Sequence, residues 1–263
     1  MKQSVKYLIL STFMIFILSA AAQAQDRKFN FGIHIAPNVS WMKPDVDGGE
    51  FYKYEKNGGR FLMGYGADFN YFFIPNIGIG TGVNVNYNGG KLKYPTVYYA
   101  RDPNTGIVID IIQSNLSRKY KLQYLEIPLV LIGSTGDLMG KFSIYGKFGI
   151  GTAFKLRARA DDEYVVRNNV EKSYTQKNVN IGDSTLFIRE SLIIGVGGTY
   201  KFEKIISINF GINFNSGFTN VFSDSYNEEV ELAYRNNPNN PNIKRVKESA
   251  KANYIEMYVG ILF

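Results

Sequence analysis

Few residues of this chain could carry out chemistry. The sequence of 263 residues has no cysteine and a single histidine, His34. Disulfides, thiolate metal sites and cysteine nucleophiles are therefore excluded, and one imidazole cannot supply the paired histidines of zinc hydrolases. A Ser/His/Asp triad would depend on His34 alone. We therefore expect no enzymatic activity, no metal site and no cofactor.

Two groups of charged residues could bind or relay ions. The first, called here the basic group, could attract anions or bind lipopolysaccharide phosphates, unless Asp161, Asp162 and Glu163 neutralise it. The second, called here the polar cluster, could relay protons or ions if its members share an interior. The basic group consists of Lys155, Arg157, Arg159 and Arg189, and the polar cluster of His34, Asp68, Glu126, Lys147 and Glu256.

The elements that must position these groups are β-strands. In residues 29–41 most odd positions are apolar, Ile33 and Trp41 among them, whereas the even positions are small or polar. Such alternation is typical of a strand with one apolar and one polar face. The same period predicts seven more strands, at residues 61–73, 77–87, 119–132, 142–158, 184–200, 206–214 and 251–263.

The connections between these strands are alternately short and long. Short turns are expected at residues 74–76, 133–140 and 201–205, and long loops at 42–60, 88–118, 159–183 and 215–250. This pattern predicts an all-β fold, an eight-stranded antiparallel transmembrane up-and-down β-barrel with short periplasmic turns and long extracellular loops. Ten strands is the alternative, because residues 96–100 and 107–113 could pair as an extra hairpin. We favour the interpretation that these two segments extend the third and fourth strands.

The polar face of the strands distinguishes a membrane barrel from a soluble one. Its residues are mostly glycine and asparagine, such as Gly80, Asn84, Gly211 and Asn213, rather than the Lys and Glu expected on a face bathed in water. Small polar residues suit the narrow lumen of an eight-stranded barrel. We therefore predict that the apolar face contacts lipid and that the polar face lines the lumen.

Both ends of the sequence resemble targeting signals. Residues 1–24 combine Lys2 and Lys6, an apolar stretch and the small-residue pattern Ala22-Gln23-Ala24, as in a cleaved signal peptide. Residues 25–263 would then form the barrel domain. The last strand resembles the signal read by the outer-membrane insertion machinery, with Ile255, Met257, Val259, Ile261 and the final aromatic Phe263. Together these ends predict an integral protein of a Gram-negative outer membrane.

Several motifs resemble the outer-membrane β-barrel family known as porin-family or PorT-like. Segments 65–69, 78–82 and 145–149 and the closing strand are similar to that family, and residues 124–131, Tyr-Leu-Glu-Ile-Pro-Leu-Val-Leu, resemble its Y-L-E-I-P-L core. The resemblance covers essentially all of the mature chain and implies a compact eight-stranded barrel. The namesake of the family belongs to a protein-secretion and gliding apparatus, although no motif here assigns that role in particular.

The strand at residues 119–132 needs one adjustment in this scheme. If Tyr120, Leu122 and Tyr124 face lipid, an unbroken strand would also place Glu126 in lipid, at a high cost. A β-bulge near Tyr124 and Leu125 would turn Glu126 inward.

The polar cluster would then lie at one height in the lumen. If Ile132 pairs with Lys141, Glu126 lies opposite Lys147, and the two opposite charges stabilise each other. The cluster could form an ion pathway or a polar plug. We favour the plug, because eight strands leave an interior just wide enough for side chains.

Three classes of function remain open for such a barrel. We favour a structural or interaction protein that contacts an envelope protein or a glycan through its loops, in contact with outer-membrane lipid and lipopolysaccharide. A narrow porin is the alternative, supported only by the Gly and Asn residues of the lumen, and a membrane enzyme is disfavoured. Nucleic acid is not an expected partner, because the formal charge, +7 less Lys2 and Lys6, is spread across loops and lumen and no Arg-rich helix or interleaved aromatic motif is present.

Overall fold

The fold consists almost entirely of β-strands. The computed structural model describes residues 28–45, 53–138, 140–167, 171–202, 206–223, 232, 236 and 247–263. The expected signal peptide, residues 1–24, lies outside the described residues. Within the described residues, no helix is long and apolar enough to cross a membrane.

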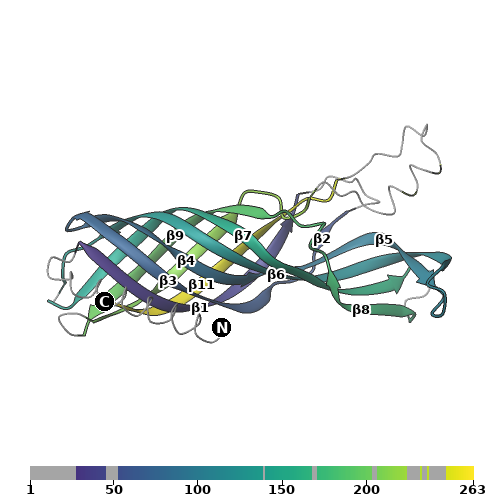
Figure 1. The fold of residues 1–263 in the computed structure, drawn as a ribbon, viewed down its shortest axis with the longest axis horizontal. Helices are drawn as coiled ribbons and strands as arrows, with labels where there is room; N and C mark the ends of the chain where they lie inside the picture. The colour runs from purple at the N-terminus through teal and green to yellow at the C-terminus, as the bar shows by residue number, and fades with distance from the viewer. Residues whose placement is uncertain are drawn as a thin grey trace, which may run out of the picture.

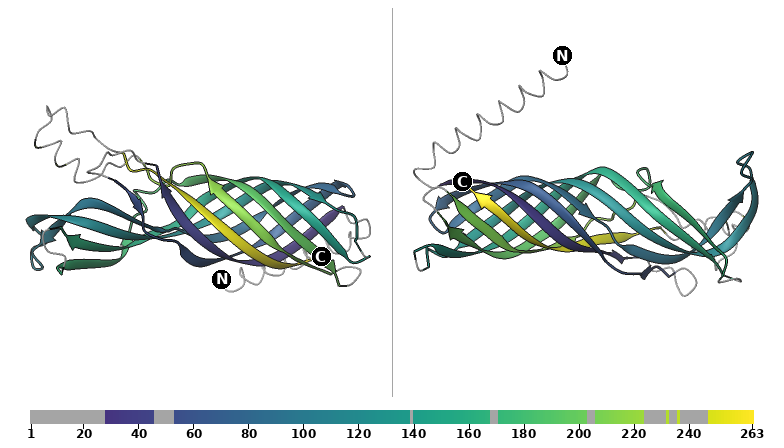
Figure 2. Two further views of the ribbon diagram at one scale, coloured as in Figure 1. Left: turned by 180° about the vertical axis from the view of Figure 1, so that it is seen from behind. Right: turned by 90° about the horizontal axis from the view of Figure 1, so that it is seen from below.

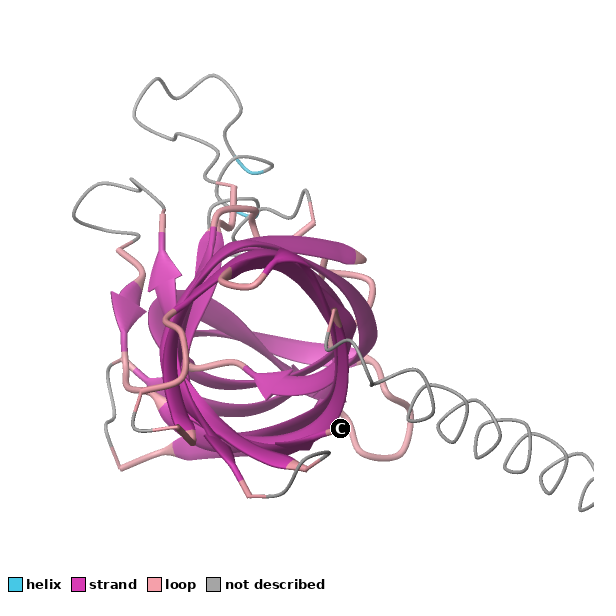
Figure 3. Ribbon diagram, turned by 90° about the vertical axis from the view of Figure 1, so that its left-hand side faces the viewer, coloured by secondary structure: helices cyan, strands magenta, loops and turns pink. Residues whose placement is uncertain are grey.

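Eight strands form a closed barrel. They are β1 (Phe29–Pro44), β3 (Arg60–Ile74), β4 (Ile77–Asn88), β6 (Val108–Ser134), β7 (Phe142–Val166), β9 (Ile188–Lys201), β10 (Ser207–Gly217) and β11 (Ala250–Leu262). Each pairs antiparallel with the next, and β1 also pairs with β11, so the pairings form a ring (Figure 3). The expected eight-stranded up-and-down barrel is therefore confirmed, and ten strands is wrong for the barrel wall.

Two barrel strands continue beyond the barrel as a second sheet. β6 has 27 residues and β7 has 25, more than twice the roughly 9–11 that a tilted strand needs to cross hydrocarbon. β5 (Lys91–Arg101) pairs with the far half of β6, β8 (Ser173–Asn180) pairs with the far half of β7, and β2 (Glu55–Lys56) pairs with β5. We call this layer the outer sheet. It projects from the barrel at the end where the long connections lie, called here the loop end (Figures 1 and 2).

The segments considered for an extra hairpin lie in the outer sheet. Residues 107–113 belong largely to β6, so they extend the fourth barrel strand as expected. Residues 96–100 lie in β5, a separate strand that does not extend the third barrel strand. They pair with residues 110–114 of β6, so the extra hairpin does form, but outside the barrel wall. The glycines at positions 89 and 90 separate β5 from β4. A Cβ on Gly89, whose φ is 143°, would lie 2.3 Å from the carbonyl oxygen of Tyr120.

The outer wall of the barrel is apolar on all sides. Every barrel strand presents large hydrophobic side chains outward, about half of whose surface is exposed in the isolated chain. One from each strand is Ile33, Phe69, Ile79, Leu129, Phe148, Ile194, Ile212 and Met257. So large an exposed apolar surface is found on a protein that meets hydrocarbon rather than water. The apolar residues on all eight strands thus agree with the prediction that the apolar face contacts lipid.

β6 keeps one phase along its length, contrary to expectation. Tyr120, Leu122 and Tyr124 are at most 2% exposed and point inward, as Glu126 does. The expectation that these three residues face lipid is wrong, because they belong to an apolar core inside the loop end of the barrel. The bulge predicted in β6 is therefore not needed there.

The irregularity lies in the partner strand β7. The register shifts between Gln123 and Tyr124, where Leu156 of β7 has no direct partner. Leu156 and Arg157 are both exposed, and the inward positions change from odd, as at Ala153, to even, as at Ala158. One extra residue in a strand produces such a change of phase.

Candidate functional site

The structure brings all five members of the polar cluster together. They come from five different strands and line one cavity of about 30 Å³ inside the barrel, room for roughly two water molecules. Nδ1 of His34 lies 2.7 Å from Oδ2 of Asp68. The members are His34, Asp68, Glu126, Lys147 and Glu256.

Glu126 forms its ion pair with Arg189 rather than lying opposite Lys147. β6 and β7 pair Ile132 with Lys147 and Glu126 with Ala153, so the expected pairing of Ile132 with Lys141 is wrong. The physical reason is the turn, where Phe142 donates its N–H to the carbonyl of Leu138 and keeps these residues out of the β6–β7 ladder. Sequence alternation cannot reveal how many residues a turn uses.

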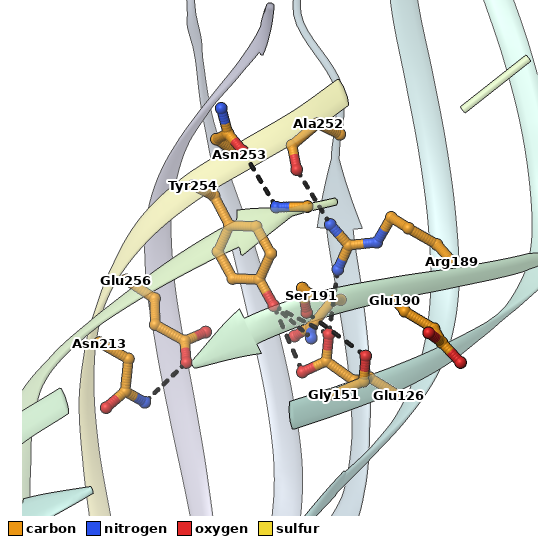
Figure 4. A network of polar contacts seen from close by, with 12 residues as sticks. Glu126, Gly151, Arg189, Glu190, Ser191, Asn213, Ala252, Asn253, Tyr254 and Glu256 are labelled. Carbon is orange, nitrogen blue, oxygen red and sulfur yellow. Dashed lines mark hydrogen bonds and ion pairs between the residues drawn. The ribbon is translucent and has the colours of Figure 1, made fainter. Parts of the chain in front are cut away.

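Arg189 reaches Glu126 across the lumen from β9. Its Nη2 lies 3.0 Å from Oε2 of Glu126, and both side chains are at most 3% exposed (Figure 4). Nη1 donates to the carbonyl oxygen of Ala252 at 3.3 Å, and the Tyr254 hydroxyl donates to Oε2 of Glu126 at 3.1 Å. The guanidinium also lies 5.4 Å from the ring centroids of Tyr124 and Tyr254. These contacts take the place of water around a buried ion pair.

The other charges of the polar cluster have partners as well. Nδ2 of Asn213 donates to Oε1 of Glu256 at 2.8 Å. The ammonium of Lys147 lies 4.6 Å from the ring centroid of Tyr258 and 5.2 Å from that of Tyr145. Gly195 leaves the space that Asn213 occupies, because a Cβ at that position would lie 2.0 Å from Oδ1 of Asn213.

The lumen is filled with side chains at the loop end and hollow at the other end. Met42, Tyr120 and Tyr124 are at most 1% exposed within the loop-end core. At the opposite end, which we call the turn end, a second cavity of about 320 Å³ reaches the turn residues 75–76 and 134–137. Lys147 lines both cavities. Within the described part of the chain, the loop-end core separates the polar cluster from the outer sheet.

The chemistry available to the lumen is electrostatic. Three carboxylates face the basic side chains of Lys147 and Arg189 and the single imidazole of His34. No group of three or more potential metal ligands comes together in the described residues. The geometry is that of a hydrogen-bonded polar plug, in which removal of one charge leaves another unpaired and buried.

The structure does not bring the basic group together. Arg189 lies in the lumen, and Nζ of Lys155 donates to the carbonyl oxygens of Gly182 and Thr185 at 2.5 Å each. Arg157 and Arg159 lie on the outer wall, because the bulge at Leu156 changes the phase of β7. The ring of basic residues expected at the barrel mouth is therefore not formed by these four side chains.

The nearby acids also have other partners than those expected. Asp162 accepts two hydrogen bonds from Arg118, at 2.7 Å each, and Asp161 lies 2.5 Å from Nζ of Lys121. Asp161 also accepts a bond of 2.9 Å from the backbone N–H of Asn178. Partial burial works in the opposite direction, but these two hydrogen bonds hold the pKa of Asp161 below its usual range.

Sequence reasoning missed an apolar surface at the far tip of the outer sheet. Outward residues of β6 are apolar from Leu125 to Leu131, polar at odd positions from Gln123 back to Gln113, and apolar again before that. We call Ile107, Ile109 and Ile111 the isoleucine tip, and they are 65%, 68% and 45% exposed. The return of isoleucine at every second position after six polar ones was the available signal.

Comparison with known proteins shows the family of the chain. The outer membrane protein beta-barrel domain model matches residues 21–223. The Yersinia pestis attachment invasion locus protein Ail has 12% identity, covering 90% of this chain and 99% of its own, with a TM-score of 0.34. The Neisserial surface protein NspA has 10% identity over 88% and 95%, with a TM-score of 0.34.

The N-terminal barrel of Pseudomonas aeruginosa OprF has 10% identity, covering 88% of this chain and 97% of its own, with a TM-score of 0.31. No curated protein sequence matches the chain. The family match spans more than half of the chain, and it agrees with the ring of paired strands and the apolar outer wall. The chain therefore belongs to the outer membrane protein β-barrel domain family and is an integral outer-membrane protein.

Proposed function

We propose that this protein is a non-enzymatic interaction barrel, in which the membrane-spanning part anchors the outer sheet and the isoleucine tip binds an apolar surface of another envelope protein. The observation that carries this proposal is the isoleucine tip itself. Its three side chains expose about half or more of their surface. Exposed apolar groups that cluster outside lipid mark protein contact sites.

The position of the isoleucine tip separates it from lipid. Ile111 lies twelve positions along β6 from Gln123, which is at the edge of the apolar wall. At about 3.3 Å per residue this is roughly 40 Å along the strand. The intervening outward positions, among them Lys119 and Lys121, are polar or charged. Lipid contact therefore does not account for the exposed isoleucines.

The turn that carries the isoleucine tip is held by local hydrogen bonds. Oδ1 of Asp102 accepts from the backbone N–H groups of Asn104 at 2.7 Å and Thr105 at 3.1 Å, and Arg101 donates to the carbonyl of Gly106 at 3.0 Å. A surface ordered before binding loses less conformational entropy when a partner docks.

The filled loop end of the lumen favours this proposal over the narrow porin. Tyr120 and Tyr124 occupy the space that a water path would need. A secretion or gliding apparatus, to which the namesake of the PorT-like family belongs, is one kind of complex in which such a partner would be found. The signal at residues 255–263 would serve assembly by the insertion machinery rather than this contact.

The test is cross-linking in native membranes. The variant carries Ile107→Ser, Ile109→Ser and Ile111→Ser, and the matched control carries Gln113→Ser and Asn115→Ser on the same face of β6. Tagged proteins are cross-linked, extracted in mild detergent and identified by mass spectrometry. We expect the wild type and the control to capture one partner in stoichiometric amounts and the isoleucine variant to lose it. Retention of the partner by the isoleucine variant, or no partner in any sample, would refute the proposal.

A further inference from the structure

A cluster of cations covers the outer wall where β5, β6 and β7 leave the barrel. Cross-strand pairing places its members on one face, with Lys91 opposite Lys119 and Lys121 opposite Arg159. We call it the basic patch, and it consists of Lys91, Lys93, Lys119, Lys121, Arg157 and Arg159. The carboxylates on or beside this face are Glu55, Asp161 and Glu163, three against six cations.

Within the described structure the basic patch has fewer carboxylates than cations. Cations directly opposite each other on neighbouring strands destabilise a sheet, and two such pairs occur here. Asp161 pairs with Lys121. Within the described residues, Arg157 and Arg159 form no ion pair or side-chain hydrogen bond, and Nε of Arg159 is buried without an acceptor. A bound anion would relieve this repulsion and satisfy the arginines.

The position of the basic patch indicates the source of that anion. On β7 the outward apolar residues run from Ile144 to Leu156, and Arg157 follows directly. On β4, the hydroxyl of Tyr87 accepts a hydrogen bond of 3.1 Å from Nε2 of Gln123, at the border of the apolar wall. Aromatic residues at that border are typical of the level where hydrocarbon meets headgroups. The basic patch therefore lies at headgroup height on the loop side of the membrane.

The bulge at Leu156 places an apolar and a cationic side chain next to each other on the outer wall. In a regular strand, residues 156 and 157 would point to opposite faces. Here both side chains are exposed, so an apolar residue and an arginine lie next to each other on the outer wall. A lipid with an acyl chain below and a phosphate above would contact both.

We propose that the basic patch binds the phosphate groups of lipopolysaccharide in the outer leaflet, with Arg157 and Arg159 as the main contacts and Leu156 against an acyl chain. The guanidinium group suits this ligand because it binds phosphate through two parallel hydrogen bonds. The cations of β5 and β6 extend the site across the sheet. This site is separate from the isoleucine tip and does not depend on a protein partner.

The test measures binding of purified lipid A to the full-length protein in detergent by native mass spectrometry. The variant carries Arg157→Gln and Arg159→Gln, and the matched control carries Lys141→Gln and Lys172→Gln, two exposed cations outside the basic patch. We expect the variant to bind about tenfold more weakly, as loss of charge-assisted hydrogen bonds implies. The control should bind lipid A with the affinity of the wild type. Dephosphorylated lipid A should bind the wild type weakly, with the affinity that intact lipid A has for the glutamine variant.

A second variant and a competitor keep the result interpretable. Arg157→Lys with Arg159→Lys preserves charge and should bind between the wild type and the glutamine variant, which excludes misfolding as the cause. Equal binding by the glutamine variant, or equal binding of dephosphorylated lipid A, would overturn the proposal. Displacement of lipid A by millimolar inorganic phosphate would show a site for free anions and overturn the lipid assignment.

Discussion

Replacing Arg189 with methionine tests whether the lumen holds a fixed polar plug. Methionine keeps much of the length of the side chain but removes the cation that lies 3.0 Å from Glu126. Glu126 is 2% exposed and, among the described residues, would then keep only the hydroxyl of Tyr254 as a partner. Breaking a buried ion pair by removing one member costs about 3–5 kcal/mol. We expect Arg189→Met to lower the free energy of unfolding by that amount.

The companion variants separate the ion pair from its surroundings. Glu126→Leu alone should cost a similar amount, because it leaves Arg189 buried without its carboxylate. The double variant Arg189→Met with Glu126→Leu should lose less than either single variant, since neither charge remains. We therefore expect a coupling free energy of at least about 2 kcal/mol in the double-mutant cycle.

The assay is urea-induced unfolding in lipid vesicles, followed by the fluorescence of Trp41, the single tryptophan of the chain. Trp41 lies on β1 and stacks on Phe214 of β10, so its emission reports loss of the barrel. If both single variants lost less than about 1 kcal/mol and their effects were additive, Glu126 would have access to water. That outcome would refute the polar plug and reopen a water path through the lumen.

Four further outcomes follow from the structure. Gly195→Ala should destabilise the barrel by about 1–3 kcal/mol in urea unfolding, because the added Cβ would lie 2.0 Å from Oδ1 of Asn213. Gly136→Ala should not destabilise the barrel, because the space around Gly136 is open. In planar bilayers the wild type should show no steady unitary conductance, and regular steps would contradict the filled loop end. Phe263→Ser should reduce the folded barrel recovered from outer-membrane fractions several-fold, while an unchanged yield would remove the terminal aromatic from the insertion signal. The pKa of Asp161 is lowered, so the stabilisation from its hydrogen bond to the backbone N–H of Asn178 in β8 should be present at neutral pH and lost as the pH falls through the folded-state pKa. The amide shift of Asn178 in NMR should follow this titration and should not do so in Asp161→Asn.

The strands of the barrel could be predicted because their period does not depend on their partners. β1 begins at Phe29, β4 begins at Ile77 and β7 begins at Phe142, each as expected from alternation alone. The inward direction of Asp68 and Lys147 follows from the same period, and a closed ring of strands then brings them into one cavity. The inward direction of Glu126 was expected only with a bulge in β6, which the structure does not have.

The faces of β6 could not be assigned in the same way. Tyr120, Leu122 and Tyr124 are apolar or aromatic and yet point inward, because the loop half of the lumen is an apolar core rather than a polar space. A sequence rule that places apolar residues toward lipid fails where a strand leaves the membrane, because there the outward residues Lys119, Lys121 and Gln123 are polar and the inward residues are apolar. The change of phase in β7 could not be predicted either, because a single extra residue at Leu156 cannot be recognised from the composition of the strand.

Partners across the lumen were also beyond the reach of sequence. Arg189 and Glu126 lie on β9 and β6, which are not neighbours in the barrel wall. Their contact depends on the width of the barrel and on the relative stagger of strands separated by β7. Register within the β6–β7 hairpin depends in turn on the seven residues 135–141 between the strands, whose conformation alternation does not encode.

The paired strands β6 and β7 fix the distance between the barrel and the outer sheet. One ladder of paired residues joins Ser134 at the turn end to Ser114 in the outer sheet, so no flexible tether separates the membrane from the distal hairpin. The distance between the bilayer and a partner bound at the isoleucine tip is therefore set by the number of residues in β6 and β7. Adding two residues to each strand would move that contact outward by about 7 Å along the strand while returning every side chain to its own face.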